Sequence, residues 1–401
     1  MAAIMALNAL ALDQILPALP AVGHALGIAH ANDRQWVVTA YFIGLGIGSL
    51  FYGPLSDRYG RKPVLVVALI LFLCATLICM IAQDFLIMLI ARTAAGIFAA
   101  SGRVLTVSIV RDRFEGDQMA RISSLIFFSF IIVPIIAPSL GQLILQVAGW
   151  RWIFGSVLII GVPVLLWTMV RLPETLAPQN RLGIHAGEIS AMLGMMMTQR
   201  TAMGYILATG IVSGALTGFM LSVQQIFADF FHQPAIFPIA FAAMASFMGL
   251  GSYFNSRLVE RIGARRLSHA ALIIMLVLAA LHGLIILSGQ EMLWSFMAFQ
   301  VLTTLAFAFA VPNFGAISMA PFSRGAGLAS SFQACLTTIM SALLGAGIGA
   351  AFDGTPLATA IGFFILGGAG LLAVAWGEYW RLFGFADAAG DRGDVPEAMA
   401  A

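Results

Sequence analysis

Charged residues are scarce in this sequence, and lysine is almost absent. Only 9% of the 401 residues are Asp, Glu, Lys or Arg, whereas a soluble globular domain carries about 25%. Lys62 is the single lysine. So little charge excludes an ordinary soluble globule, and a net charge of +2 is too small to indicate nucleic-acid binding.

Cysteine is also rare, and the patterns of common catalytic and metal sites are missing. Cys74, Cys79 and Cys335 fall inside apolar segments, without metal-ligand spacing or a disulfide framework, so we interpret them as small core residues. No nucleotide-binding glycine loop, metal-ligand pair or nucleophile triad has a convincing spacing. The sequence therefore predicts a protein that is not an enzyme and needs no cofactor or metal.

Long apolar segments are abundant. Hydrophobic residues make up 61% of the chain, and they gather in stretches of about 20, the length that spans a bilayer as a helix. This pattern predicts an all-α membrane protein with twelve transmembrane helices in two six-helix bundles. The expected spans are 1–19, 34–55, 63–82, 85–110, 118–146, 150–171, 202–228, 235–257, 266–288, 292–319, 326–351 and 357–381.

The basic residues lie mostly in alternate breaks between these spans. If both termini are cytoplasmic, sixteen of the twenty arginines and lysines fall on the inner side, and only Arg34 and Arg151 fall on the outer side. Basic residues concentrate in cytoplasmic loops. We therefore expect a multi-pass protein with both termini inside, and with Arg92 and Arg103 as the two cations within spans.

The chain divides into two similar halves. Its longest internal break follows the sixth expected span, and the segment 258–265 echoes the segment 55–62 at a displacement of 203 residues. We expect an N-terminal six-helix bundle at 1–172, a cytoplasmic linker at 173–200, a C-terminal bundle at 201–382 and a disordered cytoplasmic tail at 383–401.

The segment 53–63, with the sequence GPLSDRYGRKP, is a dense charge cluster between two apolar spans. Its glycines permit a tight turn, and its charges require water or a headgroup surface. The pattern resembles the loop between helices 2 and 3 of the major facilitator superfamily. The alternative is an ordinary basic loop, which explains the cations but not the glycines and the aspartate at these offsets.

The resemblance implies a conformational latch against the start of helix 11, here Arg324–Gly327. During the movement of the halves, Asp57 would exchange salt bridges with Arg111, Asp112 and Arg113 at the inner end of helix 4. The alternative is a loop that is merely solvated. The residues implied for the latch are Gly53, Asp57, Arg58, Gly60, Arg61, Arg111 and Asp112.

Asp13 is the one acidic residue that lies clearly inside an expected span. A charge at membrane depth costs at least ~2.5–3.5 kcal/mol, so such groups are candidates for function. The alternative is a polar contact or a helix-end cap before Pro17. The run 13–20, DQILPALP, resembles the helix-1 signature of the drug/proton antiporter branch, particularly the Bcr/CflA type of multidrug efflux transporter.

Arg92 is the expected partner of Asp13 in proton coupling. Both residues lie six or seven positions from the outer ends of their expected spans, so each is expected ~10 Å deep at 1.5 Å per residue. The segment 92–100, RTAAGIFAA, resembles the helix-4 motif of the family, whose arginine is linked to proton transfer. Ala95 departs from that motif, which commonly has glutamine there.

Arg103 lies eleven residues after Arg92, which is close to a whole number of helical turns and places both on one face, about 16 Å apart. It either faces a wet cavity or extends toward the headgroups. The polar residues Gln142, Gln224, Asn313 and Gln333 are the other candidates for the substrate cavity, with helix–helix hydrogen bonds as the alternative. His282 is expected at the bundle periphery.

The segment 134–142, PIIAPSLGQ, resembles the helix-5 signature of the antiporters. Proline removes a backbone donor, so Pro134, Pro138 and Gly141 are expected to bend this helix. Close helix packing explains Gly141 equally well. Ala137 and Gln142 depart from the signature, which often has glycine at those positions.

Together these patterns predict a proton-coupled exporter of small amphipathic compounds, including drugs, that works by alternating access in a bacterial inner membrane. Its expected partners are a small-molecule substrate, protons and lipids, with no nucleic acid, and it is expected to be a monomer. The alternatives are a transporter of the same fold for one metabolite, such as an amino acid or sugar, and a membrane receptor that does not transport.

Overall fold

The computed structural model describes residues 1–114, 116–177, 179, 181, 187, 194–322 and 326–383. Within these ranges the backbone is mainly helical, with short connecting turns, and contains no β-strand. The predicted linker lies partly outside the described residues, and so does the predicted tail from residue 384 onward.

The first half of the chain contains six successive spanning units. Helices α1 and α2 form one unit together with the short 3-10 helix η1, and η2 leads directly into α3. The bounds are α1 Ala2–Asp13, η1 Leu16–Ala18, α2 Leu19–Ala25, η2 Ala31–Gln35, α3 Trp36–Tyr59, α4 Arg61–Ile81, α5 Phe85–Arg113, α6 Gly116–Ala148 and α7 Arg151–Arg171.

The second half repeats this plan. The bounds are α9 Arg200–Gln225 with η4 Ile226–Phe230, η5 Pro234–Ile236 with α10 Phe237–Ile262, α11 Ala264–Leu287, α12 Leu293–Met319, α13 Ala326–Ala350 and α14 Leu357–Gly377. Among the described residues, eleven of the twelve units are long and apolar enough to cross a membrane. The twelfth unit is α6, of which the segment Ile132–Ala148 is found as a shorter apolar helix. The predicted order of twelve helices is confirmed.

Helix 1 extends further than the sequence predicts. The prediction ends it at residue 19, whereas the structure continues through η1 into α2, which ends at Ala25. Pro17 and Pro20 suggest a stop, but each stands at the start of a short helix, where proline fits because the first N–H groups have no helical partner. Asp13 therefore lies near the middle of its span, and the expected depth of about 10 Å is wrong.

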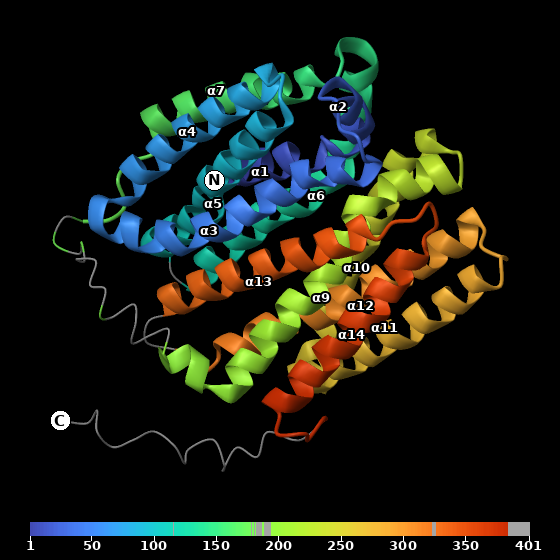
Figure 1. The fold of residues 1–401 in the computed structure, drawn as a ribbon. Helices are drawn as coiled ribbons and strands as arrows, with labels where there is room; N and C mark the ends of the chain where they lie inside the picture. The colour runs from blue at the N-terminus through green and yellow to red at the C-terminus, as the bar shows by residue number, and fades with distance from the viewer. Residues whose placement is uncertain are drawn as a thin grey trace.

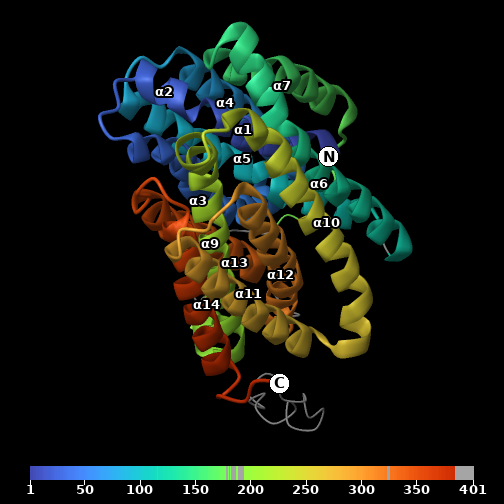
Figure 2. The ribbon, with the colours of Figure 1, turned by 90° about the vertical axis from the view of Figure 1, so that its right-hand side faces the viewer.

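The two halves lie against each other along long antiparallel helices. Figure 1 shows α1–α7 in blue to green above α9–α14 in yellow to red, and Figure 2 shows the same division from the side. The main contacts between the halves join α3 to α13 and α6 to α10. A site between the halves is therefore bordered by α3, α6, α10 and α13, which belong to the second, fifth, eighth and eleventh spanning units.

Glycine allows α3 and α5 to pack backbone to backbone. A Cβ atom added at Gly44 would lie 2.0 Å from the carbonyl oxygen of Thr93, and one added at Gly96 would lie 2.0 Å from that of Tyr41. Small residues at helix crossings are the usual way in which membrane helices approach closely. This packing holds the helix that carries Arg92 in a fixed position against α3.

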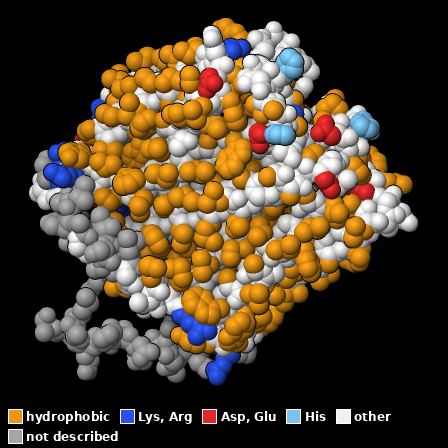
Figure 3. All heavy atoms as spheres, viewed as in Figure 1, with side chains coloured by type: hydrophobic (Ala, Val, Ile, Leu, Met, Phe, Trp, Pro, Cys, Tyr) orange, Lys and Arg blue, Asp and Glu red, His pale blue; other side chains and the backbone are white. Residues whose placement is uncertain are grey.

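The surface of the molecule is that of a membrane protein. Hydrophobic side chains cover the middle of the face in Figure 3, and charged side chains gather toward its two ends. Large apolar side chains such as Trp167 and Val170 are 68% and 80% exposed. An apolar belt of this kind is matched to lipid hydrocarbon, where nothing satisfies an exposed polar group.

The glycine contacts make a testable prediction. We expect Gly44→Ala to lower the stability of the folded protein by about 1–3 kcal/mol, because the new methyl group meets rigid backbone. The matched control is Gly347→Ala in α13, where nothing lies within 4 Å of the added Cβ and alanine favours the helix. The measurement is thermal unfolding in detergent. Equal effects of the two changes would contradict the packing described here.

Candidate functional site

Asp13 is a buried carboxylate at the point where α1 ends and η1 begins. Its side chain is 3% exposed, and its Oδ1 atom has no hydrogen-bond partner. Buried polar atoms in proteins are nearly always hydrogen-bonded, so an exception calls for a functional or structural reason. The oxygen is free to take up a proton, which is the change that lowers the cost of its burial.

Arg92, in α5, is the largest fully buried side chain among the residues described. Its Nε donates to the carbonyl oxygen of Val37 at 2.9 Å, and its Nη1 donates to that of Ala11 at 3.1 Å. The guanidinium also lies 4.4 Å from the centre of the Tyr41 ring, within the range of a cation–π contact. Backbone carbonyls and an aromatic ring therefore hold this charge inside the bundle.

The structure brings Asp13 and Arg92 into one region, but no ion pair joins them among the described residues. Ala11, whose carbonyl accepts from Arg92, is only two residues from Asp13. The Arg92 Nη2 atom and the Tyr41 hydroxyl are both buried without a partner, as is Asp13 Oδ1. Three unpartnered polar atoms from α1, α3 and α5 thus form a candidate proton site. Sequence reasoning missed Tyr41.

Arg103 occupies a different environment on the same helix. It is exposed and lines a cavity of about 240 Å³ between α3, α5 and α13. Asp57, Arg61 and Arg111 from the predicted latch line the same cavity. Gly53 lines it as well, so the structure joins one predicted cavity residue with four predicted latch residues.

The other predicted cavity residues lie elsewhere. Asn313 donates to Asn255 Oδ1 at 2.8 Å and so links α12 to α10, while Gln333 Oε1 accepts from Ser318 at 3.2 Å. Gln224 is 6% exposed and its Oε1 has no partner. Gln142 is half-buried in α6. None of these four residues lines the cavity that contains Arg103.

Two further predictions concern α6 and His282. Pro134 and Pro138 lie within one continuous helix, and a Cβ atom added at Gly141 would lie 2.1 Å from the carbonyl oxygen of Gln14, so Gly141 packs α6 against helix 1. His282 does not lie at the periphery. It is 3% exposed and pairs with Glu291 at 3.3 Å.

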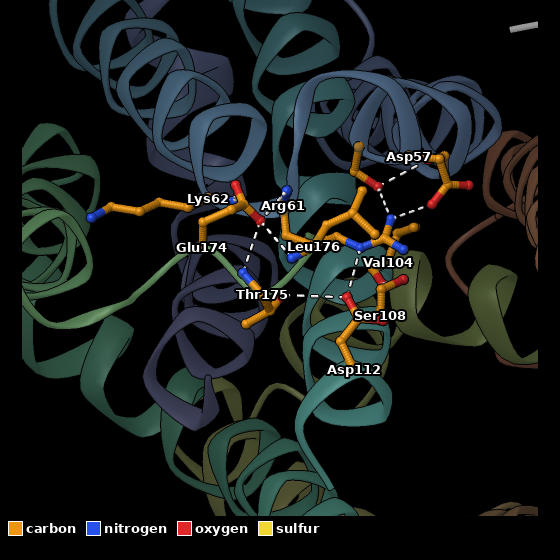
Figure 4. A network of polar contacts seen from close by, with 11 residues as sticks. Asp57, Arg61, Lys62, Val104, Ser108, Asp112, Glu174, Thr175 and Leu176 are labelled. Carbon is orange, nitrogen blue, oxygen red and sulfur yellow. Dashed lines mark hydrogen bonds and ion pairs between the residues drawn. The ribbon is translucent and has the colours of Figure 1, made fainter. Parts of the chain in front are cut away.

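The loop between α3 and α4 belongs to a network of charges at what we call the arginine-rich end, the end of the molecule that carries Arg61 (Figure 4). Arg61 pairs with Asp57 at 2.5 Å and with Asp112 at 3.0 Å, and its side chain is only 4% exposed. Asp112 comes from the end of α5. The loop thus reaches the end of helix 4 through Arg61, whereas Asp57, the residue predicted to pair with that helix end, pairs with Arg61 instead.

Glu174, just after α7, is a further member of this network. Its carboxylate accepts from the backbone N–H groups of Arg61, Lys62, Thr175 and Leu176 at 2.8–3.2 Å. Partial burial disfavours the charged form, but the four donors outweigh it and hold the pKa of Glu174 below its ordinary value of 4.5. Sequence reasoning missed this role because the contact joins segments more than a hundred residues apart.

Gly60 is required where the loop meets Glu174. Its φ angle is +101°, and an added Cβ atom would lie 2.5 Å from the Glu174 carboxylate. Positive φ strains residues other than glycine. Gly263, which the repeat of 203 residues places opposite Gly60, has φ +88° and also stands between two helices. The predicted internal repeat therefore has the same backbone geometry in both halves.

Toward the other half, the latch meets α13. The Cβ position of Gly53 is 3.2 Å from the Ser331 hydroxyl, so the absence of a side chain permits this approach. Of the predicted contact segment, Arg324 and Gly325 lie outside the described residues. Arg58 stacks over Tyr59 at 5.2 Å, and Arg111 is exposed at the cavity.

At the opposite end of the molecule, hydrogen bonds join the two halves directly. Gln35 donates to Gln225 at 2.5 Å, and Gln225 donates to Asn32 at 3.0 Å. Asn32 donates to the carbonyl oxygens of Ala350 and Phe352. Among the described residues, every hydrogen bond between the halves lies in this cluster, so this end is closed while the cavity lies toward the arginine-rich end.

Comparison with known proteins identifies this architecture. The family model described as Major Facilitator Superfamily matches residues 1–228, more than half of the chain. The chain belongs to the Major Facilitator Superfamily. Its members are transporters, and the predicted resemblance is confirmed.

Curated relatives within the superfamily match part of the chain. YdgK, an MFS-type transporter of Bacillus subtilis, is 30% identical over 69% of this chain and 71% of its own length. A bicyclomycin resistance protein homolog of Haemophilus influenzae is 26% identical over 65% of this chain and 66% of its own. Multidrug resistance protein D of Escherichia coli is 31% identical, over 45% of this chain and 46% of its own length.

Solved structures of the superfamily match nearly the whole chain in fold. A D-xylose–proton symporter aligns with a TM-score of 0.75 over 95% of this chain and 96% of its own, at 15% identity. The human organic anion transporter MFSD10 aligns with a TM-score of 0.71 over 94% and 97%, at 17% identity. At these identities the likeness establishes the two-bundle fold alone.

The Glu174 contacts predict a pH-dependent contribution to stability. We expect Glu174→Gln to lower the stability by about 1 kcal/mol at neutral pH, because a neutral amide is a weaker acceptor for four N–H groups. Since the folded-state pKa is lowered, this contribution is present above about pH 4.5 and is lost as the pH falls through the folded value.

Thermal unfolding of the wild type and the variant between neutral and acidic pH measures this difference. Glu260→Gln is the matched control, because Glu260 is an exposed acid at the corresponding loop of the second half. A difference for Glu174→Gln that stays constant down to the lowest pH would contradict the assignment.

Proposed function

We propose that this superfamily member is a proton-coupled exporter of small amphipathic compounds, including drugs. The names of two relatives, a bicyclomycin resistance protein homolog and multidrug resistance protein D, support drug export. The observation that carries proton coupling is the buried Asp13 carboxylate with an unpartnered oxygen.

The coupling follows from the surroundings of Asp13. A carboxylate in lipid or in a dry bundle favours its protonated form, and a nearby guanidinium or water favours the ionised form. Rocking of the two halves changes the access of water to Asp13, and with it the balance between these two effects. Asp13 therefore loads a proton from one side of the membrane and releases it to the other.

The orientation belongs to this proposal. The arginine-rich end faces the bacterial cytoplasm, as expected from the distribution of basic residues, and both termini lie on that side. The hydrogen-bonded cluster of Asn32, Gln35 and Gln225 then closes the outer side. In this orientation the cavity lies toward the cytoplasm, from which cargo is collected. Transport of one metabolite in the same fold is the second candidate.

The first test of this function is Asp13→Asn. Asparagine has nearly the same shape but does not titrate, so we expect proton-driven efflux of fluorescent amphipathic compounds, tested as an anionic, an uncharged and a cationic dye, to fall to the level of protein-free vesicles. Asp84→Asn is the matched control, because Asp84 is an exposed N-cap residue of α5 and asparagine caps equally well. Undiminished efflux by the Asp13 variant would refute the coupling mechanism.

The second test concerns the closed end. In a background without Cys74, Cys79 and Cys335, we expect a short bismaleimide to link Gln35→Cys to Gln225→Cys and to stop transport, because the halves can no longer separate there. Each single cysteine variant, treated in the same way, serves as a control. Full transport by the cross-linked protein would show that this end does not need to open.

A further inference from the structure

The cavity at Arg103 has walls from both halves of the protein. Helices α3 and α5, with Arg61 at the start of α4, supply one side, and α13 supplies the other. Its volume of about 240 Å³ is slightly below the range of ligand pockets, ~300–1,000 Å³. A site whose walls belong to different halves changes shape when the halves move, as a transported compound requires.

The charges lining this cavity are unbalanced. Arg61, Arg103 and Arg111 line it, against Asp57 as the one acidic residue in the lining. Arg61 is already paired with Asp57 and with Asp112. Arg103 and Arg111 form no hydrogen bond or ion pair with any residue that the structure describes. Two guanidinium groups thus face the cavity with no compensating partner among the described residues.

Arg103 and Arg111 are arranged to act on the same bound molecule. They are eight residues apart on α5, which is slightly more than two turns, so they lie on one face about 12 Å from each other. Planar guanidinium groups bind carboxylate, sulfonate and phosphate through paired hydrogen bonds. Arg103 is the deeper of the two, and Arg111 stands nearer the end of the helix.

The remaining walls combine hydroxyl groups with apolar side chains. Ser49, Ser108 and Ser331 offer hydroxyl groups, and Leu45, Val104 and Leu328 offer apolar contact. This combination accommodates a small molecule with one charged group and an apolar body. A cationic molecule would meet two uncompensated positive charges instead.

We propose that this cavity binds a small amphipathic anion as cargo, with its acidic group on Arg103 and its body between α3, α5 and α13. The assignment rests on the proposed export function and narrows its substrate class. It also has an energetic consequence. When a proton enters and an anion leaves, both movements carry positive charge inward, so an inside-negative membrane potential drives the exchange in addition to the pH gradient.

Binding to purified protein tests the site independently of transport. The probe is 7-diethylaminocoumarin-3-carboxylate, and its uncharged methyl ester is the matched ligand. By fluorescence anisotropy we expect the acid to bind tighter than the ester, and Arg103→Gln to weaken the acid ~10-fold or more, which corresponds to the loss of a charged hydrogen bond. Arg103→Lys keeps the charge and restores part of the affinity.

Arg113→Gln is the control for this binding experiment. Arg113 is exposed at the end of the same helix but does not line the cavity, so we expect unchanged affinity. Equal affinity for acid and ester, or an affinity for the acid that Arg103→Gln leaves unchanged, would overturn the proposal.

Transport in proteoliposomes separates cargo from a resident lipid and tests the two proposals separately. We expect the acid to move out under an imposed inside-negative potential, and Asp13→Asn to abolish that movement. Displacement of the bound acid by short-chain phosphatidylglycerol, without any transport of the acid, would identify a lipid headgroup site and overturn the assignment as cargo. Proton-driven export of the ester but not the acid would overturn this inference and leave the proposed function intact.

Discussion

The hydrocarbon of a bilayer offers no hydrogen bonds, and this constraint determines where every polar group of the chain lies. A charge at membrane depth costs at least ~2.5–3.5 kcal/mol unless protein groups replace water around it. Arg92 meets the constraint with two backbone carbonyls and the Tyr41 ring. It reaches Val37 and Tyr41, which belong to α3, because Gly44 and Gly96 allow α3 and α5 to touch. Close glycine packing and the buried charge are therefore parts of one arrangement.

Much of the fold and part of the site follow from the sequence for the same reason. Lipid makes charge within a span rare, so Asp13, Arg92 and Arg103 stand out among apolar neighbours, and the structure places Asp13 near Arg92 and Arg103 at a cavity. The glycines of the repeated loop can also be predicted from the sequence. Positive φ at Gly60 and Gly263 leaves glycine as the residue that fits without strain.

Other features depend on contacts between distant segments, which no local pattern reveals. The end of helix 1 was predicted too early because Pro17 and Pro20 are compatible with both a stop and a new start. Neither the role of Glu174 nor the closure by Asn32, Gln35 and Gln225 has a local signature. Each requires knowing which helices meet, and polar residues in apolar segments look the same whether they bind a neighbouring helix or a ligand.

The structure adds a symmetry that the sequence comparison did not include. Glu174 follows the last helix of the first half and accepts from the loop after Gly60. Glu378 follows the last helix of the second half and pairs with Arg265, two residues after Gly263, at 2.9 Å. An acid at the end of each half thus fixes the loop between that half's second and third helices. Each of these contacts joins two segments of the same six-helix bundle at the arginine-rich end. Such internal contacts are consistent with two bundles that each move as a rigid unit.

The separation of the proton site from the cavity determines how the two can communicate. Arg92 and Arg103 are eleven residues apart on α5, or about 16 Å. Two unit charges at that distance interact by about 1 kcal/mol at an effective dielectric constant of 20. Driving a two-state equilibrium from one side to the other takes about 5.5 kcal/mol. Direct electrostatics is therefore too weak to link proton and cargo, and the link must pass through the movement of the halves that both sites share.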